Sequence, residues 1–354
     1  MVNKKEIEAF CRHIKEHYSD IVSDNRMLKE IWNQAGKLNI FVNDLREDSI
    51  YILDTLSKYS IYDFPFWLQR DVLIPLFEKI ASKEQKDKYL QKLKCGELIC
   101  ALAITEETGG SSFDNIASRV KFSNGEYVIT CRKNVVTNAC FADIFFLVTK
   151  DDSNALCIFL VESKNVRISV EKTNTVSYID GLGIGSVTCN SLIVDNANKL
   201  GDAGSIKISL MYSLAIERFC CATLALNICQ EMYEKIVKWI KCRDLNKKYE
   251  SIWFELSDYS IALLEKKAYF NIVKDEFINK RNLFYSAAKI KYSTVTLALN
   301  LSSSIARICG CYSIDENSNI NVIKYLNLSH AYAAAGGTQE VMLQIVSRFV
   351  QTLE

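Results

Sequence analysis

Proline and histidine are scarce in this chain of 354 residues, and each scarcity narrows the possible structures and chemistries. The two prolines, Pro65 and Pro75, both fall in the N-terminal part, where we expect them to mark helix boundaries. His13 and His17 are spaced to share a helix face, but no third ligand lies near them in the sequence. No G-x-S-x-G segment provides a nucleophile elbow. We therefore expect neither a metal site nor a serine-hydrolase triad.

Charge of one sign and long apolar runs are also lacking. The 43 Lys and Arg residues balance 42 Asp and Glu residues, so no field favours nucleic acid or an acidic membrane surface. No apolar run reaches the ~18–20 residues that span a bilayer, and the first residues predict an amphipathic helix instead of a signal sequence. These absences predict a soluble, cytoplasmic protein that neither binds nucleic acid nor crosses a membrane.

Cysteine, in contrast, is plentiful: the chain has 13, but no C-x-x-C pair. Most of the cysteines fall inside apolar runs, where a free thiol behaves as a small hydrophobic side chain. An odd number of cysteines with this placement indicates a reducing compartment. We expect free, buried thiols at the positions within apolar runs, namely Cys100, Cys131, Cys157, Cys189, Cys220, Cys221 and Cys229.

Hydrophobic periodicity divides the chain into three regions. Residues 1–97 carry apolar positions at helical spacing, residues 98–203 hold short β-rich runs separated by turns, and residues 204–354 are helical again. Asn124-Gly125 between two alternating segments predicts a hairpin, and no helix-length segment separates the strands. The pattern predicts an α+β fold class with an antiparallel barrel or sandwich between two helical domains.

Two glycine-bearing segments stand near the joints between these regions. In residues 101–112 an apolar run of small residues ends in Thr105, two acidic residues, two glycines and two serines. In residues 335–342 two glycines precede Thr338, and a helical pattern continues through Arg348. Glycines let backbone approach a ligand closely, which suits a binding site. An ordinary turn would explain either segment taken alone.

Three segments together resemble the acyl-CoA dehydrogenase family over nearly the whole chain. Residues 104–111, ITEETGGS, are similar to its T-E-x-x-x-G-S signature, and residues 133–143 to its K-x-W-I-T-N…A-D strand. Residues 337–348, which begin GTQE, are similar to its G-T-x-x-I…R segment. The resemblance implies an N-terminal helical domain, a middle antiparallel β-barrel and a C-terminal four-helix bundle, with FAD between them.

The same resemblance implies roles for individual residues. Ser111 would touch both flavin and substrate, and Arg218 would bind substrate. Thr137 would contact the isoalloxazine ring, while Thr338 and Glu340 would reach the adenosine half. The residues implied to bind FAD are Leu102, Ile104, Thr105, Gly110, Ser111, Val135, Thr137, Arg243, Thr338 and Glu340.

The catalytic base is the sharpest prediction. Removal of a proton beside a thioester needs a carboxylate at the α-carbon and donors for the developing enolate oxygen. Many family members carry the base in a Y-E-G-T sequence, but Gly336 occupies that position here. Isovaleryl- and long-chain-type members carry it in an E-R pair on the first long helix of the bundle, which Glu217-Arg218 matches. The resemblance therefore implies Glu217 as the base and the Gly336 N–H as an enolate donor.

The position of Glu217 favours the same role independently. It interrupts an apolar stretch, so burial would raise its pKa, as a general base requires. The alternative is an ordinary Glu-Arg pair buried between helices.

The chain also departs from the family pattern. Val135 replaces a Trp beside the flavin, and Asn246 and Lys247 replace the Phe and Gly that follow the Arg matched by Arg243. The leading hypothesis is FAD-dependent α,β-dehydrogenation of an acyl thioester, on CoA or on a carrier protein, in a specialised biosynthetic pathway. A flavin-dependent oxidase or monooxygenase on the same fold and a non-catalytic, flavin-free partner subunit stay open as alternatives. The expected partners are the thioester, an electron-transferring flavoprotein, and further copies of the chain in a homodimer or homotetramer.

Overall fold

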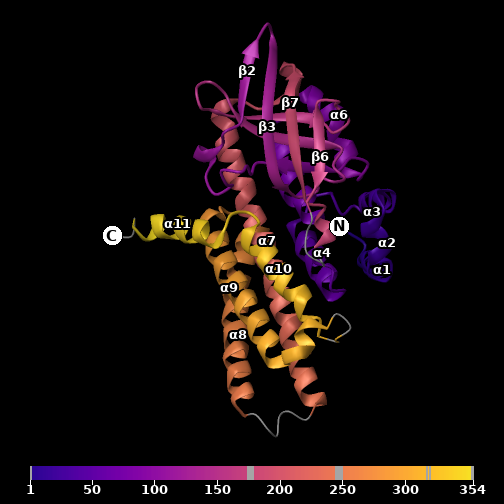
Figure 1. Cartoon of the computed structure of the whole chain (residues 1–354), viewed down its shortest axis with the longest axis vertical. Coiled ribbons are helices and arrows are strands. Elements are labelled where there is room, and N and C mark those ends of the chain that lie inside the picture. The colour runs from indigo at the N-terminus through magenta and orange to yellow at the C-terminus, as the bar shows by residue number, and fades with distance from the viewer. Residues whose placement is uncertain (1, 174–178, 244–249, 316–317, 319, 352–354) are drawn as a thin grey trace. The chain divides into compact units, whose positions relative to one another are not determined.

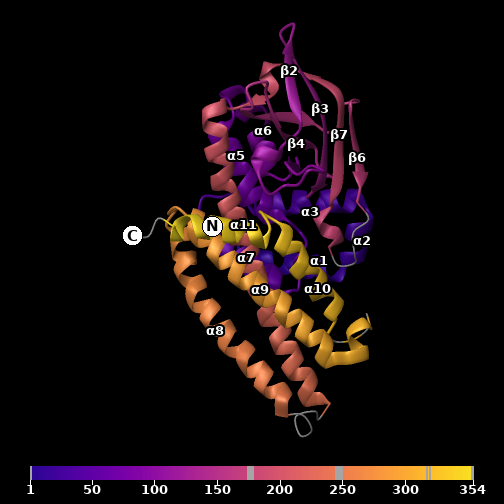
Figure 2. The same ribbon diagram turned by 60° about the vertical axis from the view of Figure 1, so that its left-hand side comes forward.

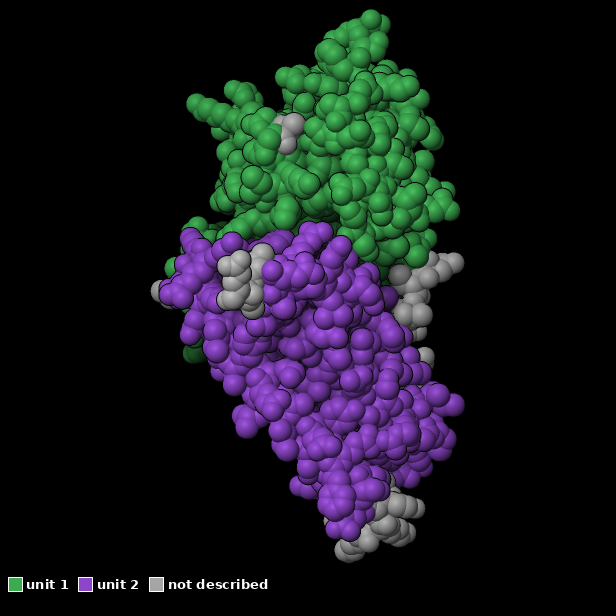
Figure 3. All heavy atoms as spheres, turned by 90° about the vertical axis from the view of Figure 1, so that its left-hand side faces the viewer, with its two compact units in different colours: residues 1–176, 180–214 green, residues 177–179, 215–354 purple. Residues whose placement is uncertain are grey.

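The chain divides into two compact units in the computed structural model, which describes residues 2–173, 179–243, 250–315, 318 and 320–351. The first unit holds residues 1–176 and 180–214, and the second holds residues 177–179 and 215–354 (Figure 3). The helices before residue 98 thus share one compact unit with the strands. The three-part division expected from the sequence stays a prediction.

The first unit begins with helices whose apolar positions recur at helical spacing (Figure 1). Ile7, Phe10 and Ile14 on α1 are buried, as their spacing predicts. Pro75 lies in the first turn of α5, directly after a π-helical turn at Leu68–Leu73, which agrees with the expected boundary. The helices are α1 Lys4–Glu16, α2 Tyr18–Ser23, α3 Asn25–Lys37, α4 Arg46–Lys58, α5 Ile74–Ile80 and α6 Lys83–Lys94.

An eight-stranded sheet follows in the same unit, in the order β6-β7-β3-β2-β4-β5-β8, with β1 paired to β4. The α+β class is confirmed, but the expected barrel is not: among the described strands, β6 and β8 end the order without pairing to each other. The strands are β1 Cys100–Ala103, β2 Arg119–Ser123, β3 Glu126–Val136, β4 Ile144–Lys150, β5 Leu156–Glu162, β6 Ile168–Lys172, β7 Gly185–Val194 and β8 Lys199–Leu200.

The sheet is also not wholly antiparallel. β1 and β4 run parallel, with Cys100 opposite Ile144, and β2 pairs with β4 in parallel at Arg119 and Lys150. The β2–β3 hairpin lies between β1 and β4 in the chain. It returns the chain to the end of the sheet where β1 began, so β4 pairs in parallel with β1 without a crossover helix. The sequence lacked the helical segment that normally signals such a pair.

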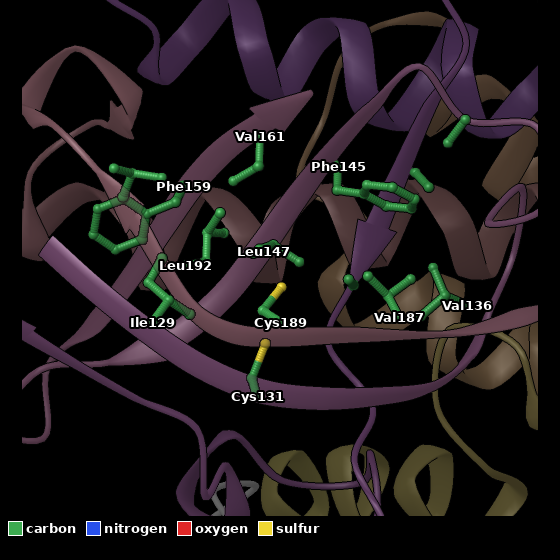
Figure 4. Packing of buried hydrophobic residues seen from close by; sticks show 14 of the residues in the cluster. Ile129, Cys131, Val136, Phe145, Leu147, Phe159, Val161, Val187, Cys189 and Leu192 are labelled. Carbon is green, nitrogen blue, oxygen red and sulfur yellow. The ribbon is translucent and has the colours of Figure 1, made fainter. Parts of the chain in front are cut away.

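The hairpin at Asn124-Gly125 is confirmed, because Ser123 pairs with Glu126 and both turn residues have positive φ, 55° and 84°. Such a two-residue turn matches the natural twist of the strands. Inward-facing side chains of the sheet form the core of the unit (Figure 4). Cys131 and Cys189 lie opposite each other in that core, on β3 and β7. The thiols expected to be free and buried are so in all seven positions.

The second unit is helical. Figures 1 and 2 show α8 beside α9 and α7 beside α10, and the ring of Phe219 on α7 stacks on Phe277 of α8 at 4.4 Å. Tyr325 of α10 donates from its hydroxyl to Glu231 of α7 at 2.8 Å. The predicted four-helix bundle is therefore present, followed by a shorter helix. The helices are α7 Ala203–Cys242, α8 Glu250–Ile278, α9 Phe284–Cys309, α10 Val322–Ala334 and α11 Gln339–Val350.

The α7 helix is long, with 40 residues, and apolar. Gly204–Cys242 is long and apolar enough to cross a membrane by length and composition alone. However, 72% of its most apolar 18-residue window is buried inside the protein. That burial is typical of a core helix in a folded bundle.

Candidate active site

The segment after β1 carries the first group of predicted site residues, within the first unit. A Cβ added at Gly110 would lie 2.6 Å from the Thr105 hydroxyl oxygen, so any larger residue there would force the Thr105 side chain to move. The backbone N–H of Asn134 donates to the Thr105 carbonyl at 2.8 Å. This bond ties the first predicted flavin segment to the start of the second, so the structure brings them together.

The residues expected to touch flavin share one property within the first unit. Each keeps part of its surface accessible, whereas the residues beside them are buried, such as Ala103, Lys133 and Val136. The set combines apolar side chains with hydroxyls and a glycine backbone, which suits a planar ring with polar edges. It therefore fits a flavin, although binding by each residue stays a prediction. The set is Leu102, Ile104, Thr105, Gly110, Ser111, Val135 and Thr137.

A buried ion pair, whose role the sequence did not reveal, holds these two segments. Lys133 donates to the Glu106 carboxylate at 2.6 Å and to the Val148 carbonyl at 2.5 Å, and its side chain has no exposed surface. The backbone N–H groups of Ala117 and Ser118 also donate to Glu106. Burial alone would raise the pKa of Glu106, but the hydrogen bonds from Lys133 and Ser118 outweigh it and hold the pKa below its usual range.

Val135 stands out by its backbone conformation. Its φ is +53°, a region that β-branched residues avoid, and 60% of its surface is exposed. The register of β3 against β7 shifts between Lys133 and Val136, so the strand bulges at this position. Strained backbone of this kind is frequent at ligand sites. It supports the expectation that Val135 lies against the cofactor.

We expect Val135→Gly to raise the free energy of unfolding of the cofactor-free protein by about 0.5–1 kcal/mol, because glycine adopts positive φ without the penalty that valine incurs. Urea denaturation measures the change. Val170→Gly on β6 is the matched control, since Val170 is also exposed but has no positive φ, and it should lower stability. Equal losses in both variants would contradict the strain at Val135.

The turn before α11 carries the second group of predicted site residues, within the second unit. Gly336 and Gly337 have φ of +64° and +105°, so the chain reverses here through two consecutive left-handed residues. Thr338 then caps α11, its hydroxyl accepting from the Val341 N–H at 3.4 Å. Glu340 lies in the first turn of that helix, where its charge suits the positive end of the helix dipole.

Glu217 lies directly against this turn. The Gly336 N–H donates to its carboxylate, and a Cβ at Gly336 would come within 3.3 Å of Glu217 Cγ. Burial raises the pKa of Glu217 above its usual range, although Lys291 and Arg218 pull it down. A half-buried carboxylate that resists ionisation has the character of a general base.

The Gly336 amide therefore faces the base itself in this structure. The Gly336 N–H is predicted to donate a hydrogen bond to an enolate oxygen. To do so, it must either donate to both the oxygen and the Glu217 carboxylate or release the carboxylate. That role stays a prediction.

Arg218 holds the same turn from α7. Its Nε donates to the Gly336 carbonyl at 2.9 Å, and its guanidinium lies 5.8 Å from the Phe284 ring centroid. The residue is 5% exposed, and its Nη1 has no hydrogen-bond partner among the described residues. A buried donor left without a partner is costly, so it suits an acceptor atom of a bound ligand. This agrees with the predicted contact between Arg218 and substrate.

Lys291 on α9 is a site residue that the sequence reading missed. It is fully buried and donates to the carbonyls of Ala335 and Gly337, on either side of Gly336. The signal was present in the sequence, since Lys291 interrupts a helical run of apolar positions that includes Ala287, Ala288 and Val295. A lysine at a core-facing position needs partners, and here both are carbonyls of the glycine turn.

Arg243 is not brought to this turn. It follows α7 at the far end from Glu217, about 40 Å along the helix at ~1.5 Å per residue. Its guanidinium stacks 4.0 Å from the Tyr312 ring centroid and 4.8 Å from that of Trp239. Asn246 and Lys247 lie outside the described residues. A contact between Arg243 and FAD stays a prediction.

Two family models match this chain, and both describe domains of one family. Residues 101–192 match the model of the acyl-CoA dehydrogenase middle domain, and residues 208–351 match that of the acyl-CoA dehydrogenase C-terminal domain. The mitochondrial long-chain specific acyl-CoA dehydrogenase of Mus musculus is 22% identical, over 96% of this chain and 83% of its own. The 3-(aryl)acrylate reductase of Clostridium sporogenes is 25% identical, over 94% and 84%.

A third relative matches a shorter part. The L-prolyl-(peptidyl-carrier protein) dehydrogenase of a Serratia strain is 26% identical, over 48% of this chain and 45% of its own. Among solved structures, an acyl-CoA dehydrogenase from Geobacillus kaustophilus superposes with a TM-score of 0.89, at 20% identity and 99% coverage of both chains. PigA with FAD and proline gives a TM-score of 0.86, at 17% identity, over 98% of this chain and 96% of its own. The two family models cover more than half of the sequence, and the chain belongs to the acyl-CoA dehydrogenase family.

Proposed function

We propose that Glu217 removes the α-proton of an acyl thioester in an FAD-dependent α,β-dehydrogenation. As a family member, the protein is a flavin oxidoreductase that acts on a CH–CH bond of acyl thioesters and uses FAD. The observation that carries the assignment of the base is the contact of Glu217 with the turn at Gly336, where burial raises the pKa of the carboxyl.

The residues divide the work as follows. Glu217 takes the α-proton and becomes a carboxylic acid, while the electrons of the broken C–H bond form the new double bond. FAD, when bound, supplies the acceptor for the hydride that leaves the β-carbon. The unpartnered Nη1 of Arg218 donates to an acceptor atom of the substrate beside Glu217. Thr105, Ser111 and Thr137 would hold the cofactor through their hydroxyl groups, and Val135 would lie against it.

We further propose that the thioester is carried by a protein instead of CoA. One relative is named for a prolyl group on a peptidyl-carrier protein, and the structure of PigA was solved with FAD and proline. A 4′-phosphopantetheine arm presents the same thioester to Glu217 on either carrier. An electron-transferring flavoprotein is the proposed acceptor of the electrons, with a cytoplasmic homodimer or homotetramer as the working form.

The test is the absorption spectrum of the purified protein before and after anaerobic addition of acyl thioesters. One series of acyl groups is loaded on a carrier protein and the matching series on CoA. We expect a yellow protein whose flavin absorbance is bleached by at least one thioester, and more rapidly by the carrier-bound form. Reduction by CoA thioesters alone would overturn the carrier assignment and leave the dehydrogenase in place.

Two further outcomes would contradict the dehydrogenase itself. A colourless protein that cannot be reconstituted with FAD would indicate a non-catalytic partner subunit. Rapid peroxide formation by the reduced protein, without an acyl product containing a double bond, would indicate an oxidase or monooxygenase.

A further inference from the structure

Lys291 is a buried lysine in the second unit to which the proposed mechanism gives no role. It has no exposed surface, yet it lies on the buried face of α9 with Ala287, Ala288 and Val295. Removing a lysine from water is costly, and the cost is repaid only by well-placed partners. Its ammonium donates to Ala335 O and Gly337 O, so both acceptors belong to the turn that carries Gly336.

The turn at Gly336 does not need the charge of Lys291 to be held in place, because two other side chains already bind it. Arg218 already binds the middle of the turn through Gly336 O, at 2.9 Å. Gln339 already ties the start of α11 to α9, donating to Tyr292 O at 3.1 Å and to Thr296 Oγ1 at 2.9 Å. Lys291 adds a third connection, because its ammonium binds the carbonyls of the two residues that flank Gly336.

The turn is also the surface against which Glu217 lies. Because Gly336 has no side chain, its backbone approaches Glu217 Cγ and its N–H donates to the carboxylate. A shift of the turn would therefore move the donor away from Glu217. Lys291 fixes the carbonyl before Gly336 and the carbonyl after it, so it fixes the direction in which the Gly336 N–H points.

We propose that Lys291 is a positioning residue for the catalytic base, holding the Gly336 turn against Glu217 and keeping a positive charge beside the carboxylate. This inference rests on the proposed role of Glu217. It assigns to α9 a part in the chemistry that neither glycine motif reveals.

The charged and titratable groups around Glu217 within the second unit are Arg218 and Cys221 on α7 and Lys291 on α9. Burial holds the pKa of Lys291 below its ordinary value and Arg218 lowers it further, while the Glu217 carboxylate opposes the shift. Burial raises the pKa of the Cys221 thiol to about 12, so it stays neutral. Arg218 and Lys291 are therefore the two cations that help Glu217 to ionise.

Two variants separate the charge from the hydrogen bonds. Lys291→Gln keeps a donor and removes the charge, so the acid limb of the kcat/KM profile should move to higher pH. Lys291→Arg keeps the charge but fits the cavity poorly, so kcat should fall by roughly 10–100-fold with the acid limb near its original place. Gln339→Ala is the matched control, because it removes a tie between α11 and α9 without removing a charge near Glu217, so it should move the acid limb less than Lys291→Gln does.

An infrared titration provides a readout that does not depend on turnover. The carboxylic acid band of Glu217, identified by its loss in Glu217→Gln, should disappear at higher pH in Lys291→Gln than in the unsubstituted protein. An unmoved band and limb in folded Lys291→Gln would overturn the inference. If Glu217→Gln keeps its activity, the assigned base is wrong, whereas loss in Glu217→Gln with no shift in Lys291→Gln refutes only the role of Lys291.

Discussion

Glu217→Gln is expected to lower the rate of flavin reduction by an acyl thioester by roughly 10²–10⁴-fold, the usual contribution of a positioned general base. Glutamine has nearly the same shape and can still accept from the Gly336 N–H, but it cannot take a proton. Substrate binding should change little, because Arg218 and the glycine turn remain in place. Stopped-flow absorbance with a saturating thioester measures the rate.

The control is Glu234→Gln, which makes the same chemical change at an exposed position on the same helix. It should reduce flavin at the original rate. Unchanged reduction in Glu217→Gln, with a double bond still formed in the product, would show that another group removes the α-proton.

Glu217→Gln, which should lower activity, is expected to raise stability. The folded protein holds the pKa of Glu217 above the ordinary value of 4.5, so folding favours the protonated form. The contribution of Glu217 to the free energy of unfolding is greatest at a pH below its ordinary pKa. That contribution is lost as the pH rises through the raised pKa of the folded protein. Glutamine mimics the protonated state, so Glu217→Gln should have a higher Tm than the unsubstituted protein at neutral pH.

The largest loss of stability is expected at the buried pair of Glu106 and Lys133. Glu106→Gln leaves the ammonium of Lys133 without its counter-charge in a site with no exposed surface, at a cost of about 3–5 kcal/mol in the free energy of unfolding. Because the pair joins the two segments at Thr105 and Val135, FAD binding should weaken as well. Urea denaturation and a flavin fluorescence titration measure the two effects.

Glu171→Gln is the matched control for that loss. Arg132, the neighbour of Lys133, forms an exposed pair with Glu171 at 3.5 Å, and removing it should cost no more than about 1 kcal/mol. Since the pKa of Glu106 lies below its usual range, its contribution persists at neutral pH and is lost as the pH falls below about 4.5. Similar losses for both Gln variants would mean that the buried pair adds no special stability.

Periodicity and turn chemistry were enough to predict most of the fold. The apolar spacing placed the helices, the Asn124-Gly125 turn placed the β2–β3 hairpin, and the apolar runs placed the buried cysteines. The closure of the sheet was not predictable, because closure depends on pairing between strands distant in the chain. The parallel pairing of β1 with β4 was missed for the same reason, since a hairpin replaced the usual crossover helix.

Candidate site residues could be named from the sequence where they had a local signature. Glu217 and Gly336 were singled out because an acidic residue breaks an apolar run and a glycine stands where many family members carry the base. The structure places the two close together, and their roles stay predictions. Lys291 also interrupts an apolar run, but its function could not be inferred from that signal, because its partners are backbone carbonyls that no sequence motif identifies. Glu106 and Lys133 were seen only as parts of motifs, since their pairing requires two segments to meet in space.

The two-glycine turn limits how such an enzyme could change during evolution. A glutamate at position 336, where many family members carry their base, would have to adopt a φ of +64° with its Cβ 3.3 Å from Glu217 Cγ. A base at both positions would thus strain the backbone at position 336 and require the Glu217 side chain to shift. A lineage moving the base from one location to the other would have to tolerate that strain in an intermediate or rebuild the turn. The two locations are therefore expected to persist as distinct branches of a family.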